Sequence, residues 1–298
     1  MGAAPPSAVG GRDLDATRTL TPWRARIARA EQLARARPFV AEPLTFYAGL
    51  ATRQEQLLSH HPTERPGREL APLVPEFLAD VCNLGPMDLI AQLGSLSSDE
   101  PWGELIERYW KSGGREPNDA SEVRRFVIEA VLQPFAEASA SSASASARMD
   151  LERATARLRP TSPTSPTSPT RLTSPTSPSR PTCPFCDSPP LLAILREEGH
   201  GARRSLQCGL CLTEWPAMRL VCCACGEGTF DKLVVFRADD VKGVRVDACE
   251  SCRTYMKTID LTEDGTAIPL VDDLATIPLD LWARANGYHR ERANLLRL

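Results

Sequence analysis

The sequence predicts an α+β protein of several domains: an all-helical N-terminal domain, two small metal-binding modules and a C-terminal helix. Three observations predict this arrangement. Apolar residues recur at helical spacing in the first half of the chain, a proline-rich run follows, and nine of the ten cysteines lie within residues 183–252. The 298 residues, 42% hydrophobic and 24% charged, suffice for about two domains with buried cores.

The N-terminal half predicts helices. Residues 1–19 are rich in Ala, Gly and Pro without an apolar period, which is typical of a disordered tail. Residues 20–160 show apolar positions three and four apart and no alternating strand pattern, so they predict a helical domain. Helices are expected from Thr21, at residues 43–58, 70–84, 87–93 and 102–110, and from Asp119 or Ser121.

The first of these helices carries several arginines. Pro22 suits its first turn, and Trp23, Ile27 and Leu33 define its apolar face. Four basic residues are expected on the opposite, exposed face: Arg24, Arg26, Arg29 and Arg35.

A low-complexity segment follows the helices. Alternating Ala and Ser at 138–147 lead to a short, charged, helix-like stretch at 149–157, and five Thr-Ser-Pro repeats begin at Thr161, Thr164, Thr167, Thr173 and Thr176. Proline at every third position removes backbone donors and fixes φ, so residues 161–182 predict an extended linker. The alternative is a docking site for a partner that binds or modifies proline-rich segments.

Four Cys-x-x-Cys pairs follow the linker, separated by 21, 10 and 23 residues. Two residues between cysteines allow both sulfurs of a tight turn to bind one metal ion. Two such turns complete a closed tetrahedral thiolate site, typical of zinc or of rubredoxin-type iron. The two long intervals flanking a short one indicate a duplication.

We therefore expect two consecutive rubredoxin-like or zinc-ribbon-like modules, over residues 183–220 and 221–298, the second including the C-terminal helix. Their predicted metal ligands are Cys183, Cys186, Cys208 and Cys211 in the first module and Cys222, Cys225, Cys249 and Cys252 in the second. Each long interval has room for a β-hairpin, with strands expected at 191–195, 203–207, 233–237 and 243–246. A cross-braced arrangement, in which the first pair joins the third, is the alternative. Metal removal is expected to unfold residues 183–260 and to leave the helical domain intact.

Two cysteines remain outside these sites. Cys223 is expected to point away from the metal, with a register in which it replaces Cys222 as the alternative, and Cys82 belongs to the helical domain. Adjacent pairs without a secretion signal do not favour disulfides, and a thioredoxin-like redox pair would need a βαβ context that is missing.

Two acidic residues precede the last predicted helix. Asp272 and Asp273 are interpreted as its caps, because acidic side chains favour the positive end of a helix. The helix itself is expected to begin near Thr276, since Pro278 suits only a first turn.

Composition limits the function classes. Residues 183–298 hold 14 Lys and Arg against 17 Asp and Glu, which accounts for the whole net charge of −3, so neither half is basic and nucleic acid is an unlikely main partner. No apolar run approaches the roughly 18 residues that span a bilayer, and no basic segment leads into an apolar one at the N-terminus, so we expect a cytoplasmic protein. No phosphate loop, Ser-His-Asp order or HExxH helix is present, so neither a catalytic residue nor an enzyme activity is predicted.

Specific strings surround the cysteines. They are Cys183-Pro184-x-Cys186 followed by Ser188-Pro189-Pro190, Cys208-x-Leu210-Cys211-x-Thr213-Glu214-Trp215, Cys249-x-x-Cys252-x-Thr254-Tyr255-Met256-Lys257, Val271-Asp272-Asp273-Leu274-Ala275 and Gly287-Tyr288-x-Arg290. Over residues 183–298 they resemble the formate dehydrogenase accessory (FdhE) family. The chain departs from the usual knuckle pattern, because the residue after the second cysteine is Asp187, Leu212 or Arg253 in three pairs and glycine only at Gly226.

The resemblance implies a cytoplasmic accessory factor for the maturation of formate dehydrogenase, a molybdenum- or tungsten-dependent iron–sulfur enzyme, whose catalytic subunit it would contact. It also implies iron in two rubredoxin-type tetrathiolate sites, with zinc as the alternative. Two other functions remain open at this point: a zinc-ribbon adaptor that binds nucleic acid or transcription machinery, and electron transfer by rubredoxin-like iron. The oligomeric state is left open.

Overall fold

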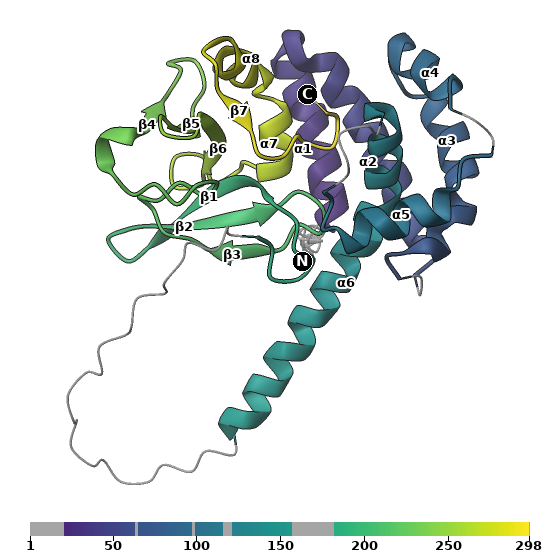
Figure 1. Ribbon diagram of the computed structural model, residues 1–298, viewed down its shortest axis with the longest axis horizontal. Helices are drawn as coiled ribbons and strands as arrows, with labels where there is room; N and C mark the ends of the chain where they lie inside the picture. The colour runs from purple at the N-terminus through teal and green to yellow at the C-terminus, as the bar shows by residue number, and fades with distance from the viewer. Residues whose placement is uncertain (1–20, 63–64, 97–98, 116–120, 157–181, 298) are drawn as a thin grey trace, which may run out of the picture.

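The computed structural model describes residues 21–62, 65–96, 99–115, 121–156 and 182–297. The tail predicted at 1–19 and the linker predicted at 161–182, except Thr182, lie outside these residues. Helices form one half of the molecule and strands the other, and one long helix projects from the body (Figure 1). The predicted order, helices followed by a strand-rich, cysteine-rich region, is confirmed.

The N-terminal half consists of helices at the predicted places. They are α1 (Pro22–Ala36), α2 (Ala41–His60), α3 (Val74–Cys82), α4 (Met87–Gly94), α5 (Trp102–Lys111) and α6 (Glu122–Ala156), with 3₁₀ turns η1 (Pro38–Val40) and η2 (Arg68–Leu73). Thr21 caps α1, since its hydroxyl accepts the Arg24 N–H at 3.2 Å. The helix expected at 70–84 divides into η2 and α3. Neither Pro72 nor Pro75 has a backbone N–H, so each suits only the start of an α-helix, and α3 begins at Val74, directly before Pro75. Within the described residues no helix is both long and apolar enough to cross a membrane.

Two arginines expected on the exposed face of α1 are buried instead. Arg26 donates to Glu137 of α6 (Nη1 to Oε2, 2.9 Å), and Arg29 donates to Asp272 (Nη2 to Oδ1, 2.6 Å). Each arginine is only 8% exposed, whereas the other two are exposed as predicted. The expectation fails here because the carboxylate partners lie 111 and 243 residues further along the chain, beyond the reach of a helical pattern.

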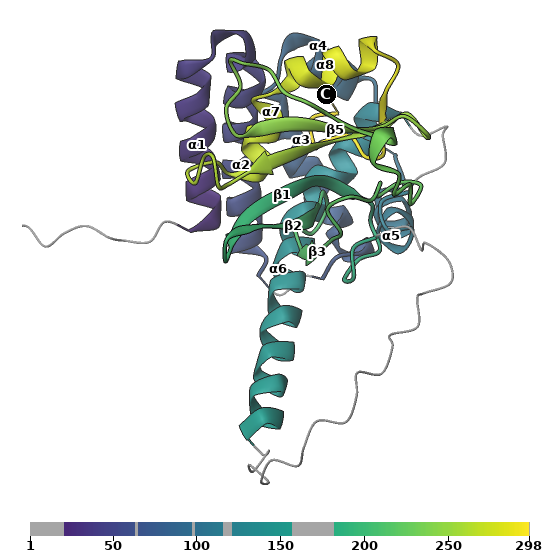
Figure 2. The ribbon, with the colours of Figure 1, turned by 90° about the vertical axis from the view of Figure 1, so that its left-hand side faces the viewer.

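Helix α6 is longer than its apolar pattern indicates. It continues through Pro134 and the Ala-Ser run to Ala156, so the separate stretch expected at 149–157 is part of one helix of 35 residues. Alanine is the strongest helix former, which explains why this run stays helical although it offers little to bury. In Figures 1 and 2 the second half of α6 extends away from the body.

The C-terminal half is built on one sheet of seven strands. These are β1 (Pro190–Glu198), β2 (Gly201–Cys208), β3 (Glu214–Pro216), β4 (Leu233–Phe236), β5 (Val244–Cys249), β6 (Thr254–Asp260) and β7 (His289–Arg290), with η3 (Phe230–Lys232) before β4. The order is β3-β2-β1-β6-β5-β4, and β7 pairs with β6. The four predicted strands coincide with β1, β2, β4 and β5. The parallel pairing of β1 with β6, where Ile194 lies opposite Ile259, joins both cysteine modules in one sheet.

Two short helices, α7 (Pro269–Leu274) and α8 (Ile277–Ala285), follow the sheet. The last helix begins as predicted, with Thr276 at the N-cap position of α8. Helix α7 lies between the sheet and the helical half and contacts α1, α2, β1 and β6 (Figures 1 and 2).

The main apolar core extends across both halves. It contains Tyr47 of α2, Val127 of α6, Leu191 of β1 and Val271 of α7, each at most 2% exposed. Because burial of this apolar surface stabilises both halves together, the cysteine modules are not separate bodies held only by a linker.

Candidate metal centres

The first cysteine cluster forms at the open end of the β1–β2 hairpin. Cys183 and Cys186 lie in the turn before β1, and Cys208 and Cys211 lie at the end of β2 and in the turn that follows. Pairing of Pro190 with Cys208 places the two turns side by side. All four Sγ atoms lie within 4.8 Å of one another, and Cys183–Cys211, Cys186–Cys208 and Cys186–Cys211 are each 3.5 Å apart.

The second cluster repeats this plan on β4 and β5. Its sulfurs come from the turn at Cys222–Cys225, before β4, and from Cys249 and Cys252 at the end of β5. They also lie within 4.8 Å of one another, with 3.7 Å between Cys222 and Cys252 and between Cys225 and Cys249. Each cluster joins consecutive pairs, so the cross-braced alternative is not observed.

Backbone hydrogen bonds shape three of the four turns into knuckles. The N–H of Asp187 donates to the Cys183 carbonyl at 2.9 Å, and Gly226 and Arg253 donate to the carbonyls of Cys222 and Cys249 at 3.0 and 2.8 Å. Other amides point at sulfur: Leu210 and Cys211 N–H donate to Cys208 Sγ at 3.3 and 3.4 Å. Donors aimed at sulfur stabilise the thiolate, which is the form that binds metal.

The residue after each second cysteine has a positive φ, including the three positions without glycine. The φ values are 57° at Asp187, 57° at Leu212, 59° at Arg253 and 79° at Gly226. A left-handed conformation costs a residue with a side chain roughly 1–2 kcal/mol. The absence of glycine at three of these positions therefore raises the conformational energy of three knuckles and leaves their geometry unchanged.

Both sulfur sets suit one tetrahedral metal ion. With metal–sulfur bonds of about 2.3 Å, the edge of a tetrahedron of sulfurs is about 3.8 Å. The separations of 3.7 Å in the second cluster are close to this value, and those of 3.5 Å in the first are slightly shorter. Four thiolates suit zinc or iron and fill every position of a tetrahedral ion.

The two clusters differ in burial and in their neighbours. All four cysteines of the first are buried, whereas in the second Cys225 is exposed and Cys222 and Cys252 are half-buried. Hydrogen bonds with Cys183, Cys186 and Cys211, together with the charge of Arg292, lower the pKa of the Cys208 thiol. A positive charge next to the first cluster is favourable for a site that gathers thiolates.

Two family models match the cysteine-rich half of the chain, and they divide it between the two cysteine clusters. Residues 220–297 match the family model described as FdhE, C-terminal domain, and residues 182–219 match that of the FdhE central domain. Residues 182–297 thus match two domains of the FdhE family. The FdhE homologue of Aquifex aeolicus (strain VF5) is 36% identical over 113 residues, which are 37% of this chain and 40% of that protein. The homologue of Pseudomonas putida is 35% identical over 117 residues, 37% of this chain and 36% of the relative. The aligned residues thus span about two fifths of these relatives.

The similarity in fold extends further than the similarity in sequence. The crystal structure of the FdhE protein from Pseudomonas aeruginosa matches with a TM-score of 0.64 at 23% identity, and the match covers 92% of this chain and 94% of that one. At this identity the match concerns the fold. It includes the helical half, which the family models of the central and C-terminal domains do not cover.

The helical half covers the first cluster. Trp110 of α5 packs on Phe185 in the first knuckle, with ring centroids 6.2 Å apart, and Gln133 of α6 donates to the Gly209 carbonyl at 3.1 Å. Gly113, with φ of 64°, lies so close that a Cβ there would come within 2.7 Å of the Asp187 carbonyl oxygen. Residues 182–219 therefore contact the helices at the first cysteine cluster itself.

A buried polar network ties the C-terminal tail to the same place. Arg292 donates to Ser188 Oγ at 2.8 Å and pairs with Glu129 of α6 at 3.0 Å, and Glu129 also accepts from the Tyr109 hydroxyl. Arg297 pairs with Glu129 at 3.2 Å. Local sequence patterns do not predict this network, because its members are spread over more than 160 residues.

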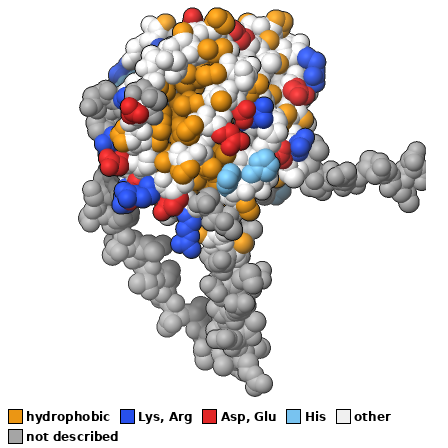
Figure 3. Space-filling model, turned by 90° about the vertical axis from the view of Figure 1, so that its right-hand side faces the viewer, with side chains coloured by type: hydrophobic (Ala, Val, Ile, Leu, Met, Phe, Trp, Pro, Cys, Tyr) orange, Lys and Arg blue, Asp and Glu red, His pale blue; other side chains and the backbone are white. Residues whose placement is uncertain are grey.

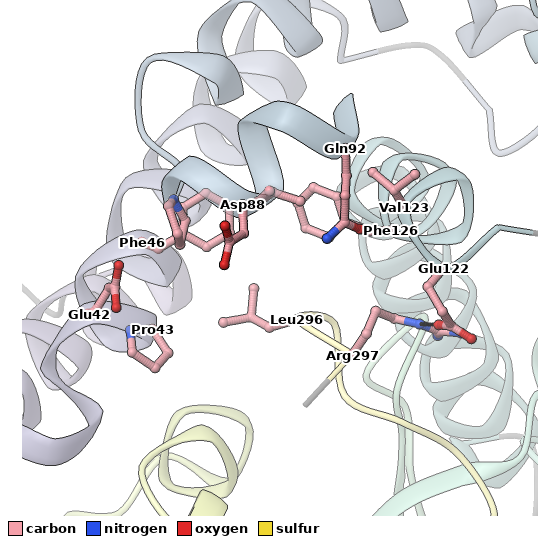
Figure 4. Close-up of a pocket in the computed structure, with 12 residues that line it drawn as sticks. Glu42, Pro43, Phe46, Asp88, Gln92, Glu122, Val123, Phe126, Leu296 and Arg297 are labelled. Atoms are coloured by element: carbon pink, nitrogen blue, oxygen red, sulfur yellow. Dashed lines mark hydrogen bonds and ion pairs between the residues drawn. The ribbon is translucent and has the colours of Figure 1, made fainter. Parts of the chain in front are cut away.

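The tail also closes a cavity of about 340 Å³ between α2, α4 and α6. Figure 4 shows Leu296 facing Phe46 and Phe126, while Glu42 and Asp88 lie at the rim. Apolar side chains also gather on one face of the helical half (Figure 3). Met87, the first residue of α4, is 79% exposed. Leu296 and Arg297, at the end of the described residues, therefore line a cavity shared with three helices.

The other predicted residues have structural partners. Cys223 points away from the second cluster, with its Sγ 4.0 Å from Met256 Sδ, and burial raises the pKa of its thiol to about 11. Asp272 and Asp273 lie inside α7, and neither caps the last helix, α8. Asp272 accepts the N–H of Ile268, the N-cap residue of α7, at 2.7 Å. Asp273 pairs with Lys257 at 3.1 Å and with Arg290 at 2.5 Å, and it is fully buried. The capping interpretation is therefore wrong for both residues, because they belong to a separate helix and two buried cations on β6 and β7 pair with Asp273.

Proposed function

We propose that this chain is an accessory factor for the maturation of formate dehydrogenase and that it contacts the catalytic subunit of that enzyme. The observation that carries the proposal is the presence, within the FdhE central and C-terminal domains, of two complete sets of four thiols. We place the protein in the cytoplasm, in keeping with that role.

The eight clustered cysteines are proposed as metal ligands, with iron in both sites and zinc as the alternative. The donor sets and sulfur separations suit either metal, and the family resemblance favours iron. Metal analysis with visible absorption, on protein purified without added metal, separates the two. Ferric tetrathiolate is coloured and zinc tetrathiolate is not.

The proposed role is not that of an enzyme. Four thiolates leave a bound ion without an open position for substrate, and such sites mainly supply folding energy. The metal would hold the sheet and its loops in the form that a partner recognises. We retain the proposed division into a helical domain (20–160), a linker (161–182) and two modules (183–220 and 221–298).

The test is complementation of a strain from which the gene has been deleted. The deletion is expected to lower formate-dependent dye reduction, and the wild-type gene to restore it. Cys208→Ser and Cys249→Ser, one in each cluster, are expected to fail, whereas Cys82→Ser, outside both clusters, is expected to restore activity. A tagged chain should retain the catalytic subunit in a pull-down. Normal activity in the deletion strain together with no complex would contradict the proposal.

A further inference from the structure

A cavity of about 510 Å³ lies on the face of the sheet that points away from the helices, beside the second cysteine cluster. It is bounded on one side by the loop with Leu220 and Cys223 and on the other by side chains of β4, β5 and β6, among them Val235, Asp247 and Met256. In Figure 1 this end of the sheet lies on the opposite side of the molecule from α2–α5, so these helices do not cover it.

Arg204 of β2 contributes a buried positive charge to this cavity. The residue is 5% exposed, its Nη1 donates to the Met218 carbonyl at 2.9 Å, and its Nε has no hydrogen-bond partner. Within the described part of the chain, Arg204 makes no ion pair. Arg245 also lines the cavity, but it is paired with Asp247 at 2.8 Å. Among the described residues, Arg204 is therefore the buried cation of this cavity that has no carboxylate partner. A buried charge without a counter-charge is unfavourable, and a bound carboxylate would remove that cost.

Large apolar side chains are exposed around the same cavity. Leu220 is 60% exposed, Phe230 is 77% exposed and Val235 is 50% exposed. They come from the loop before β4, from η3 and from β4 itself. Exposed apolar side chains that cluster at a cavity are typical of a protein-binding surface.

The strand order sets the length of this groove. Val235 of β4 and Arg204 of β2 line the same cavity although their strands lie four positions apart in the sheet. At about 4.8 Å per strand spacing their backbones are about 19 Å apart, a distance that an extended segment of about six residues covers.

We infer that this groove binds an extended acidic segment of a partner protein, which crosses the face of the sheet, covers Phe230 and Val235 with apolar side chains and places a carboxylate against Arg204. The spare buried cation selects an acidic segment over a basic one. The groove would be the contact surface for the client proposed above, and its link to formate dehydrogenase rests on that proposed function.

The probe is an array of capped decapeptides in which Val, Leu or Phe alternates with Thr around a central Glu, Gln or Lys. The full metal-loaded chain is applied, and the best binders are measured in solution by fluorescence polarisation. Glu peptides are expected to bind about tenfold tighter than their Gln and Lys counterparts, the ratio of a charge-assisted hydrogen bond. Equal binding of all three, or displacement of the peptides by tRNA, would overturn the inference.

Two variants separate this role from a purely structural one. Arg204→Met should abolish the preference for Glu and leave Tm unchanged or raised, because it removes an uncompensated buried charge. A lower Tm or an altered metal content in this variant would instead assign Arg204 to the fold or to the cluster. Phe230→Ser should weaken every peptide, while the matched control Met87→Ser, 79% exposed against 77% for Phe230, should weaken none. No formate dehydrogenase is present in the peptide assay. Failure of the peptides to bind therefore contradicts the groove alone, whereas failure of the pull-down contradicts the proposed contact with the enzyme.

Discussion

Arg292 and Glu129 form a buried ion pair, with Nη2 and Oε1 3.0 Å apart, that joins the end of the chain to the middle of helix α6. The same guanidinium donates to Ser188 in the turn next to the first cysteine cluster. One side chain thus connects the tail, the long helix and a proposed metal site. Loss of this connection should affect all three.

Glu129→Ala is expected to lower the free energy of unfolding by about 3–5 kcal/mol, because Arg292 would remain buried without a carboxylate. Urea unfolding followed by circular dichroism measures the change. Glu55→Ala is the control, since its partner Arg24 has a side chain that is 64% exposed and such pairs contribute little. Equal losses of unfolding free energy in the two variants would show that burial of the Arg292–Glu129 pair does not determine its contribution to stability.

Acid should weaken the fold partly through Asp273. Burial alone would raise the pKa of this carboxyl, but the charges of Arg290 and Lys257 outweigh burial and hold the pKa below its usual value. The folded-state pKa is therefore below the unfolded value of about 3.9, so the contribution is complete above that pH and is lost as pH falls through the folded pKa.

The check compares wild type with Asp273→Asn in urea unfolding between neutral pH and pH 3. The wild type should be the more stable at neutral pH, and the difference should shrink as the pH falls below about 4. Metal content is measured at each pH, so that acid release of metal is not counted as titration of Asp273. A difference that stays constant would rule out this linkage.

The stability of the knuckles should fall when a glycine is replaced and rise when a glycine is introduced. Gly226→Ala places a Cβ at φ of 79° and is expected to destabilise the second site by roughly 1–2 kcal/mol. Asp187→Gly relieves a residue at φ of 57° and is expected to raise Tm slightly, since part of the gain is lost to chain entropy. Thermal unfolding of the metal-loaded protein distinguishes the two. Destabilisation by both would mean that the contacts of Asp187 outweigh its backbone strain.

Local patterns in the sequence were sufficient for the cysteine sites and for most helices. A Cys-x-x-Cys turn is fixed by its own four residues, and a hairpin brings two such turns together, so the spacing favoured the consecutive grouping over the cross-braced one. The helices followed from apolar periods of three and four residues. Both kinds of inference use contacts that are close in sequence.

Contacts between distant segments were not predictable in the same way. The burial of Arg29 depends on Asp272, 243 residues later. Strand β6 carries Lys257 and Asp260 among its buried residues, so its composition does not resemble a central strand, and its pairing with β1 has no local signal. The Arg204 groove likewise depends on the order of the strands in the sheet.

The two proposed metal ions should be released in a fixed order. The second cluster has an exposed cysteine and two half-buried ones, whereas the first is buried under α5 and α6, so a chelator should reach the second first. Stopped-flow loss of the ferric absorption band, or chelator colour for zinc, should show two phases. Cys225→Ser should remove the fast phase alone. Loss of the slow phase in that variant would reverse the assignment.

Complete metal removal should loosen part of the helical half as well as the cysteine modules. The sequence alone indicated that the helices would stay intact, but Trp110 and Gln133 pack directly on the first cluster and α7 lies between the sheet and α1. Hydrogen exchange by mass spectrometry on the apo-protein should therefore show faster exchange in β1, β2, β5 and β6, and also in α5 and the first half of α6. Helices α3 and α4, which lie on the far side from the sheet, serve as the internal control and should exchange at the same rate in both forms (Figure 1). Unchanged protection in α5 and α6 would mean that the shared core holds the helices without help from the metal.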